Sequence, residues 1–196
     1  MDVWSDTLTN DDVSYTYTIT KANVTVPTVN IGTYTYAGSS QGPTITYDTT
    51  KATVSGTASA TNAGTYSFNI ALNDTTHYQW SDGTSTAKSY SWSIGKAAGS
   101  ATLSATSVTL NKTTTSATVT VSNATGTVSV TSSNASMVTA GYSSGTITIT
   151  SPDSISGSAT VTVTVAGSDN YNSKDYIISV TCDFLKIVTW AAGTDE

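Results

Sequence analysis

Arginine is absent from the 196-residue chain, and cysteine, histidine and glutamate each occur once. A single cysteine excludes an internal disulfide, so packing alone must hold the fold. The positive charges are seven lysines spread singly along a chain of net charge −6. Nucleic acids and anionic lipid surfaces are bound by clustered positive charge, so neither is an expected partner. No apolar run approaches the roughly 18 residues of a membrane-spanning helix, and no membrane insertion is expected.

Serine and threonine are abundant instead, and together they supply more than a third of the residues. With the many Val, Tyr and Ile residues they suit the pleated, half-buried surface of a strand, whereas good helix formers are scarce. Hydrophobic residues make up 37% of the chain, which is enough for a lean core. We therefore predict an all-β protein whose length fits two small domains.

One stretch occurs twice. WSDTLTNDDVSYTYTITKA at Trp4–Ala22 returns as WSDGTSTAKSYSWSIGKA at Trp80–Ala97, and the separation of roughly 75 residues is within the repeat periods of small β modules. The second copy is expected to close one module and lead into the next. By the same logic, residues 1–22 are expected to be the terminal strand or hairpin of a preceding repeat whose body is missing from the chain.

The first copy carries a strictly alternating pattern. Tyr15, Tyr17 and Ile19 share one face of the predicted strand, and Ser and Thr occupy the other. An apolar strand face left uncovered is a pairing hazard. We therefore expect these three side chains to dock against residues 23–97 or to pair with a second copy of the chain.

Residues 23–97 are predicted to form one module, because short alternating strands are separated by turn signals about every 8–12 residues. This pattern is typical of an antiparallel β-sandwich. The predicted strands are Val24–Val26, Tyr34–Tyr36, Thr44–Tyr47, Ala52–Val54, Thr65–Leu72, His77–Trp80 and Ser89–Ile94.

Residues 98–182 are predicted to form a second module of the same class with a different sequence pattern. The predicted strands are Ala101–Leu110, Ala117–Val121, Thr127–Val130, Met137–Ala140, Gly145–Ile149, Ala159–Val165 and Tyr176–Val180. Residues 183–196 break the Ser/Thr rhythm and are expected to be a linker or the start of a following module. The connections between modules are short, which favours an extended, semi-rigid array.

Two sets of motifs resemble known families. TNAGTY at 61–66 and YQWSDG at 78–83 resemble the MBG-type ("mostly β") repeats of bacterial surface proteins. LSATSVTL at 103–110, SSNASMV at 132–138 and GSATVTV at 157–163 resemble bacterial Ig-like group 2 domains. The resemblance implies two tandem Ig-like sandwiches of the kind that space, display or bind in bacterial adhesins and in phage tail and capsid proteins.

The residue types needed for catalysis are sparse. His77 and Cys182 lie in different predicted modules, whereas nucleophilic catalysis needs the nucleophile and base within hydrogen-bond reach. We expect His77 to be structural or at the surface, and Cys182 to be a buried or half-buried small hydrophobe. The aspartates fall mainly in turns, where their side chains fold the backbone. No enzymatic activity and no cofactor are expected.

Acidic and amide side chains that could bind a metal ion are adjacent at only a few places in the sequence. Asp11-Asp12 and Asp169-Asn170 could supply oxygen ligands for calcium at a module boundary. Calcium takes six or more oxygen ligands, usually from a dedicated loop, and the chain has no such loop. One histidine and one cysteine are too few for zinc. We therefore predict no metal site.

The aromatic residues are the only candidates for ligand contacts. Tyr66, Tyr90 and Trp92 alternate with polar residues and are expected in the core. Trp4, Trp80 and Tyr142 lie nearer turns, so they are the candidate surface contacts, suited to stacking on a sugar or a protein.

Two functions remain open at this stage. The first is a phage structural protein, such as a tail, fibre or capsid-decorating component that contacts host glycans or proteins; the acidic start Met1-Asp2, which is unlike a signal peptide, favours it. The alternative is a bacterial cell-surface adhesin or cell-wall repeat protein. Both place the chain on a virion or at the extracellular cell surface, among other modules of a longer protein.

Overall fold

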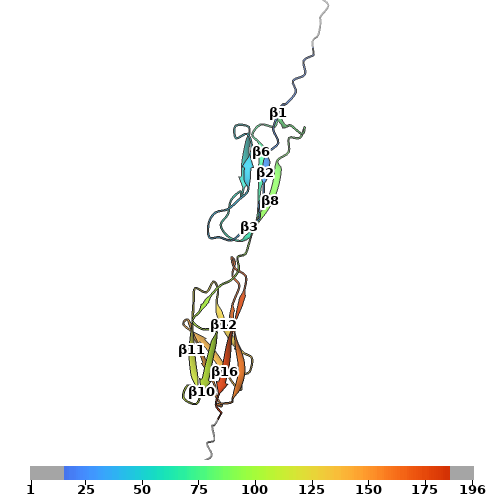
Figure 1. Cartoon of the computed structure of the whole chain (residues 1–196). Helices are drawn as coiled ribbons and strands as arrows, with labels where there is room; N and C mark the ends of the chain where they lie inside the picture. Colours follow the sequence, from blue (N-terminus) through green and yellow to red (C-terminus); the bar gives the residue numbers. More distant parts are fainter. Residues whose placement is uncertain (1–15, 186–196) are drawn as a thin grey trace, which may run out of the picture. The chain divides into compact units, whose positions relative to one another are not determined.

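The computed structural model describes residues 16–185, and every regular element in that range is a β-strand. Sixteen strands follow one another, and the described part contains no helix (Figure 1). The predicted all-β class is therefore confirmed. The strands form sheets of two to four members, and each sheet takes its strands either from residues before Lys96 or from residues after it.

The first sandwich spans residues 22–95. Seven of its eight strands overlap the predicted ones, and the additional strand is β2. The strands are β1 (Ala22–Val24), β2 (Thr28–Asn30), β3 (Tyr34–Thr35), β4 (Thr44–Thr46), β5 (Ala52–Gly56), β6 (Gly64–Leu72), β7 (Tyr78–Trp80) and β8 (Lys88–Gly95). The four-stranded sheet has the order β3-β8-β6-β5, and β1-β7 and β2-β4 form two-stranded sheets.

The second sandwich begins after Lys96 and contains two four-stranded sheets, β10-β16-β15-β12 and β13-β14-β11-β9. Its strands are β9 (Thr102–Leu103), β10 (Ser107–Asn111), β11 (Ser116–Ser122), β12 (Val128–Ser132), β13 (Thr139–Ser143), β14 (Thr146–Thr150), β15 (Gly157–Val165) and β16 (Lys174–Asp183). β13 and β14 are joined by a two-residue turn in which Ser144 and Gly145 have φ angles of 48° and 80°. Two positive φ angles are what a tight hairpin turn requires.

Grouping the residues by how closely they pack divides the chain at other positions than grouping the strands by sheet does. Among the described residues, one compact unit comprises 16–30, 44–56 and 68–90, and the other comprises 31–43, 57–67 and 91–185. The division passes through β6 and β8 of the first sandwich. The module boundaries expected from the sequence, at residues 23, 98 and 183, stay predictions.

Three of the eight buried apolar side chains of the first sandwich are aromatic. In the first compact unit, Phe68 and Trp80 are fully buried, and the ring of Phe68 stacks on that of Tyr90 with centroids 5.3 Å apart. In the second unit, Trp92 is buried against the half-buried ring of Tyr66 at 5.0 Å. The expectation that Trp92 belongs to the core is confirmed, and the two tyrosines pack at its margin.

The second sandwich has an aliphatic core. β15 and β16 form its longest antiparallel pair, with a register that runs from Gly157 opposite Cys182 to Val165 opposite Lys174. Inward-facing side chains alternate with Ser and Thr along β15 and with Ser, Thr, Asp and Ile177 along β16, because successive residues of a strand point to opposite faces. The buried cluster comprises Leu110, Val119, Val121, Val138, Ile147, Ile149, Ala159, Val161, Val163, Ile178, Val180, Cys182 and Phe184.

The predicted antiparallel pairing holds for most neighbouring strands of the described residues, but three pairs are parallel. β1 pairs with β7, β3 with β8 and β10 with β16, all in parallel. Parallel neighbours must be joined by a long crossover. β10 and β16 meet that condition because the five intervening strands of the sandwich form the crossover between them.

The predicted strand at Ala101–Leu110 is in fact two strands. β9 pairs with β11, and β10 pairs with β16 in the other sheet. Between them the Ser104 amide bonds the Thr120 carbonyl, and the Thr106 carbonyl accepts from the Ser179 amide. The chain therefore crosses from one sheet to the other within three residues.

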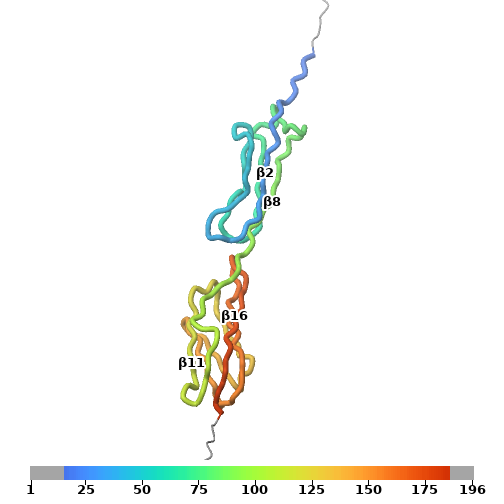
Figure 2. The backbone as a smooth tube through the Cα atoms, in the orientation of Figure 1, coloured from blue at the N-terminus to red at the C-terminus, as the bar shows by residue number. Residues whose placement is uncertain are grey.

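One of the two alternatives expected for the N-terminal segment, docking against residues 23–97, is wrong where the structure describes the segment, whereas pairing with a second copy of the chain stays a prediction. The backbone of residues 16–20 enters the first sandwich without forming a strand (Figure 2). The side chains of Tyr17 and Ile19 are 86% and 94% exposed. Neither side chain docks against residues 23–97. Tyr15 lies outside the described residues. The physical reason is that no strand edge of the first sandwich takes up the segment, since β1 begins only at Ala22.

Candidate binding surfaces and module junctions

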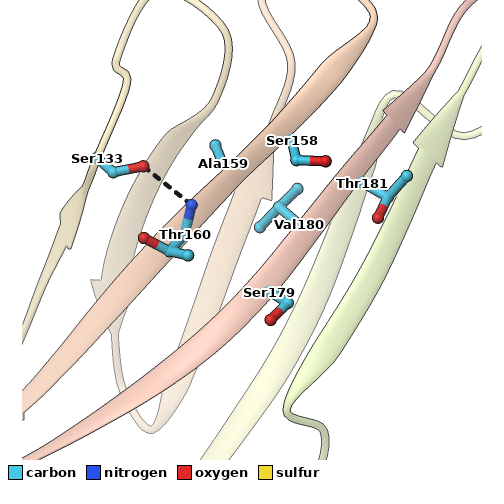
Figure 3. Close-up of a pocket in the computed structure, with 7 residues that line it drawn as sticks. All are labelled: Ser133, Ser158, Ala159, Thr160, Ser179, Val180 and Thr181. Atoms are coloured by element: carbon cyan, nitrogen blue, oxygen red, sulfur yellow. Dashed lines mark hydrogen bonds between the residues drawn. The ribbon is translucent and has the colours of Figure 1, made fainter.

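A shallow groove lies over β15 and β16 of the second sandwich. Its volume is about 370 Å³, and it is open to solvent. Figure 3 shows its lining side chains spaced along the two neighbouring strands and the adjoining Ser133. The lining consists of Ser133, Ser158, Ala159, Thr160, Ser179, Val180 and Thr181.

Five of the seven lining residues carry a hydroxyl group, Ala159 and Val180 are apolar, and none carries a charge. Ser133 Oγ already accepts a hydrogen bond from the Thr160 amide at 2.9 Å. The other hydroxyls can donate or accept hydrogen bonds, so a neutral polar ligand such as a sugar matches the lining better than an ion does. No aromatic ring belongs to the lining, and stacking of the kind that anchors sugars is therefore not available there.

The three predicted surface aromatics do not come together. Trp4 lies outside the described residues. Trp80 is fully buried, so its prediction as a surface contact is wrong: it lies opposite Val24 in the β1–β7 pair, and its indole Nε1 donates to the Thr86 carbonyl at 2.9 Å. Tyr142 lies on β13 and is half-buried against the core of the second sandwich. Its role as a ligand contact stays a prediction.

His77 is part of a local turn, as expected. Its Nδ1 lies 2.6 Å from Asp74 Oδ2, and its side chain is 72% exposed. Asp74 Oδ1 accepts hydrogen bonds from the Thr76 and His77 amides. The hydrogen bond with the His77 side chain, followed by those of the two amides, lowers the pKa of Asp74. A carboxylate held in its charged form by a turn is structural chemistry.

Asp82 repeats this arrangement at the next turn. Its carboxylate accepts hydrogen bonds from Lys88 Nζ at 2.6 Å and from the Thr84 hydroxyl at 2.7 Å. The Lys88 bond is the larger cause, and together these bonds lower the pKa of Asp82 to about 2. The turn is therefore held by a charged carboxylate at neutral pH, and protonation near pH 2 removes that contribution.

Cys182 is buried in the second core, which confirms the expectation of a small buried hydrophobe. Burial raises the pKa of its thiol, and the neighbouring Ser151 hydroxyl opposes that rise to a smaller extent. The Ser151 hydroxyl itself is buried without a hydrogen bond of normal geometry. Because the thiolate is the nucleophilic form, this environment disfavours reactivity.

Neither metal ligands nor membrane spans stand out between residues 16 and 185. That part of the chain holds no group of three or more His, Cys, Asp or Glu side chains placed to bind a metal ion. No helix there is long and apolar enough to cross a membrane.

The start of each sandwich shows the same backbone clamp. The Ala22 amide donates to the His77 carbonyl at 2.8 Å, and Ala22 pairs in parallel with Tyr78. In the second sandwich the Ala97 amide donates to the Asn170 carbonyl at 2.9 Å. Ala97 also forms a parallel bridge with Tyr171, the residue after Asn170.

The second clamp is closed from both sides. The Asn172 amide returns a hydrogen bond to the Ala97 carbonyl at 2.8 Å, and Lys96 Nζ donates to the Ser168 carbonyl at 2.7 Å. β8 ends at Gly95, so Lys96 alone separates the last strand of one sandwich from the first paired residue of the next. We call the two pairings, Ala22 with Tyr78 and Ala97 with Tyr171, the junction clamps.

Sequence reasoning missed the junction clamps, although a signal for them exists. Both copies of the repeated stretch end in Lys-Ala. In each sandwich the partner is a tyrosine that follows a short polar turn, which is NDTTH at 73–77 in one case and GSDN at 167–170 in the other. The pairing between the two elements spans most of a module, so neither element indicates it alone.

Comparison with known proteins gives matches among solved structures only. No protein-family model matches the chain, and no curated protein matches it. Among solved structures, the chain is similar to the S-layer protein rSbsC(31-844), with 16% identity, a TM-score of 0.37, and coverage of 83% of this chain and 28% of that one. Domains 1-6 of the surface layer protein SbsC give 16% identity, a TM-score of 0.36 and the same coverages.

Domains 4 and 5 of the S-layer protein SbsC are also similar, with 16% identity and a TM-score of 0.34. In this case the match covers 82% of our chain and 98% of that chain. The chain therefore spans about a quarter of the two longer S-layer structures and nearly all of the shorter one.

Proposed function

We propose that the chain is a non-catalytic array of β-sandwich modules that spaces or displays other domains at a cell or virion surface. The observation that carries this proposal is the junction clamp. In a flexible connector the chain would leave one module and run free before entering the next. Here Ala97 is already paired within two residues of the end of β8.

A one-residue connector suits a spacer. Linkers of several Gly and Ser residues behave as flexible coils, and each added residue widens the range of distances between the joined domains. A single residue between two paired segments allows little such freedom. The repetition of the clamp at Ala22 and at Ala97 supports a general means of adding one module after another.

The side-chain chemistry supports the non-catalytic part of the proposal. His77 is engaged by Asp74 in an exposed turn, and the Cys182 thiol is buried with a raised pKa. The hydroxyl-lined groove over β15 and β16 offers weak polar contacts to a host glycan. In a phage, the array would belong to a tail, fibre or capsid decoration; in a bacterium, to an adhesin or wall repeat. The full reading frame and its neighbouring genes separate the two.

The spacer role is tested by a distance distribution between the sandwiches. Spin labels are attached at Ser55→Cys and Thr118→Cys, two exposed positions on β5 and β11, in a Cys182→Ala background. Pulsed dipolar spectroscopy on the otherwise natural chain is expected to give one narrow distribution. Insertion of Gly-Ser-Gly-Ser after Lys96 is expected to broaden it at least twofold. Equal, broad distributions for both chains would overturn the spacer proposal.

A further inference from the structure

The segment before the first sandwich has the sequence pattern of β8. Aligned on the repeat, Tyr17 corresponds to Trp92, Ile19 to Ile94 and Lys21 to Lys96. Both segments alternate apolar residues with Ser or Thr over the same length. The described part of the first copy, residues 16–20, therefore has the pattern of a strand with one apolar face.

The two copies differ entirely in their surroundings. In β8, Trp92 and Ile94 are 3% and 2% exposed. Their counterparts Tyr17 and Ile19 are 86% and 94% exposed. Burial of large apolar side chains stabilises a fold, and in the isolated chain Tyr17 and Ile19 do not contribute this stabilisation.

The junction clamps show that the two copies occupy the same place relative to a following module. Lys21-Ala22 enters the first sandwich through the carbonyl of His77, and Lys96-Ala97 enters the second through the carbonyl of Asn170. In the second case the residues just before the clamp are the last strand of a sandwich. The structural equivalence of the clamps is independent of the likeness between the strand sequences.

The place that β8 occupies is specific. It lies between β3 and β6 in the four-stranded sheet, and it pairs in parallel with β3 at Tyr34–Ile94 and Thr35–Gly95. A Cβ atom added at Gly95 would be 3.5 Å from the Tyr34 carbonyl, an ordinary contact. The threonine that the first copy carries at the corresponding position, Thr20, therefore has room there.

We propose that residues 16–20 belong to the final strand of a sandwich with the fold of residues 22–95. The partner is a sandwich of that fold that lacks its own last strand, and Tyr17 and Ile19 fill the positions of Trp92 and Ile94. The first sandwich of this chain, or of a second copy, is excluded as the partner because its own β8 already fills the place. This inference goes beyond the spacer role, which stands without it.

The test supplies the missing partner. Residues 22–79 are fused directly in front of Trp4 of the full chain, so that Trp4 follows Gln79 as Trp80 does in the first sandwich. The amides of Tyr17 and Ile19 are followed by hydrogen exchange. We expect at least a hundredfold slowing relative to the unfused chain, because the amides enter a sheet. In the matched control, Tyr17→Ser and Ile19→Ser in the fused chain keep exchange fast.

A second variant guards against poor folding of the fusion. In this variant of the natural chain, four substitutions in β8 give it the sequence of residues 16–20. They are Ser91→Thr, Trp92→Tyr, Ser93→Thr and Gly95→Thr. The first sandwich is expected to remain folded, with a melting temperature lowered mainly by the loss of the 2.8 Å hydrogen bond from Trp92 Nε1 to the Thr57 carbonyl.

Three results would overturn the proposal. The first is fast exchange at Tyr17 and Ile19 in a fused chain whose added residues are otherwise protected. The second is loss of the first melting transition when β8 carries the residues of the first copy. The third is a wild-type chain that sediments as a dimer and becomes monomeric on Tyr17→Ser and Ile19→Ser, which would assign the segment to self-association.

Discussion

Replacing Trp80 by alanine is expected to lower the stability of the first sandwich by about 3–5 kcal/mol, as for a large buried aromatic side chain. Trp80 is fully buried, and its indole Nε1 donates to the Thr86 carbonyl. Each kcal/mol shifts the melting temperature of a domain of 60–100 residues by about 4–8 °C. Calorimetry should therefore show the first sandwich melting far below its wild-type temperature or already unfolded at 25 °C.

The matched control for Trp80→Ala is Trp80→Phe. Phenylalanine keeps most of the apolar volume but cannot make the hydrogen bond of the indole. The loss of stability should therefore be smaller, at about 1–3 kcal/mol, because only the Thr86 carbonyl is left without its donor. A loss below about 1 kcal/mol for Trp80→Ala would contradict the placement of this side chain in a core.

The second large effect is expected in the other sandwich. Ile178 is fully buried on β16, opposite Val161 of β15, and Ile178→Ala should cost about 2–5 kcal/mol. Its neighbour Ile177 faces outward on the same strand and is 50% exposed. Ile177→Ala should change the stability by no more than about 0.5 kcal/mol.

This neighbouring pair separates burial from strand propensity, because both substitutions change the same residue type in the same strand. Ile178→Ala should lower only the melting transition of the second sandwich, and Trp80→Ala only that of the first. Equal effects of Ile177→Ala and Ile178→Ala, or a joint shift of both transitions, would contradict the two separate cores.

The strand pattern could be predicted from the sequence because alternation is a local property. Fourteen predicted strands have counterparts in the structure, and β16 extends further, through Asp183. The split between β9 and β10 was missed although the sequence carries a signal for it. Thr106 and Ser107 are two polar residues in succession, so the apolar positions change phase where the hydrogen-bonding partner changes from β11 to β16.

The candidate contacts were harder to predict than the strands. Proximity to a turn suggested that Trp80 is exposed, yet its register opposite Val24 directs the ring inward. Alternation suggested that Tyr17 and Ile19 are covered, but a strand pattern specifies a face and not the partner that covers it. The groove over β15 and β16 arises from small hydroxyl side chains on neighbouring strands, which only the pairing brings together.

The most direct test of the array is hydrogen exchange at the Ala97 amide, which donates to the Asn170 carbonyl at 2.9 Å. If the second sandwich begins at this residue, the amide should be protected. Its opening free energy should fall together with that of the second sandwich in Ile178→Ala and stay unchanged in Trp80→Ala. Exchange at the rate of an unstructured peptide would show a free linker between the sandwiches and contradict the clamped junction.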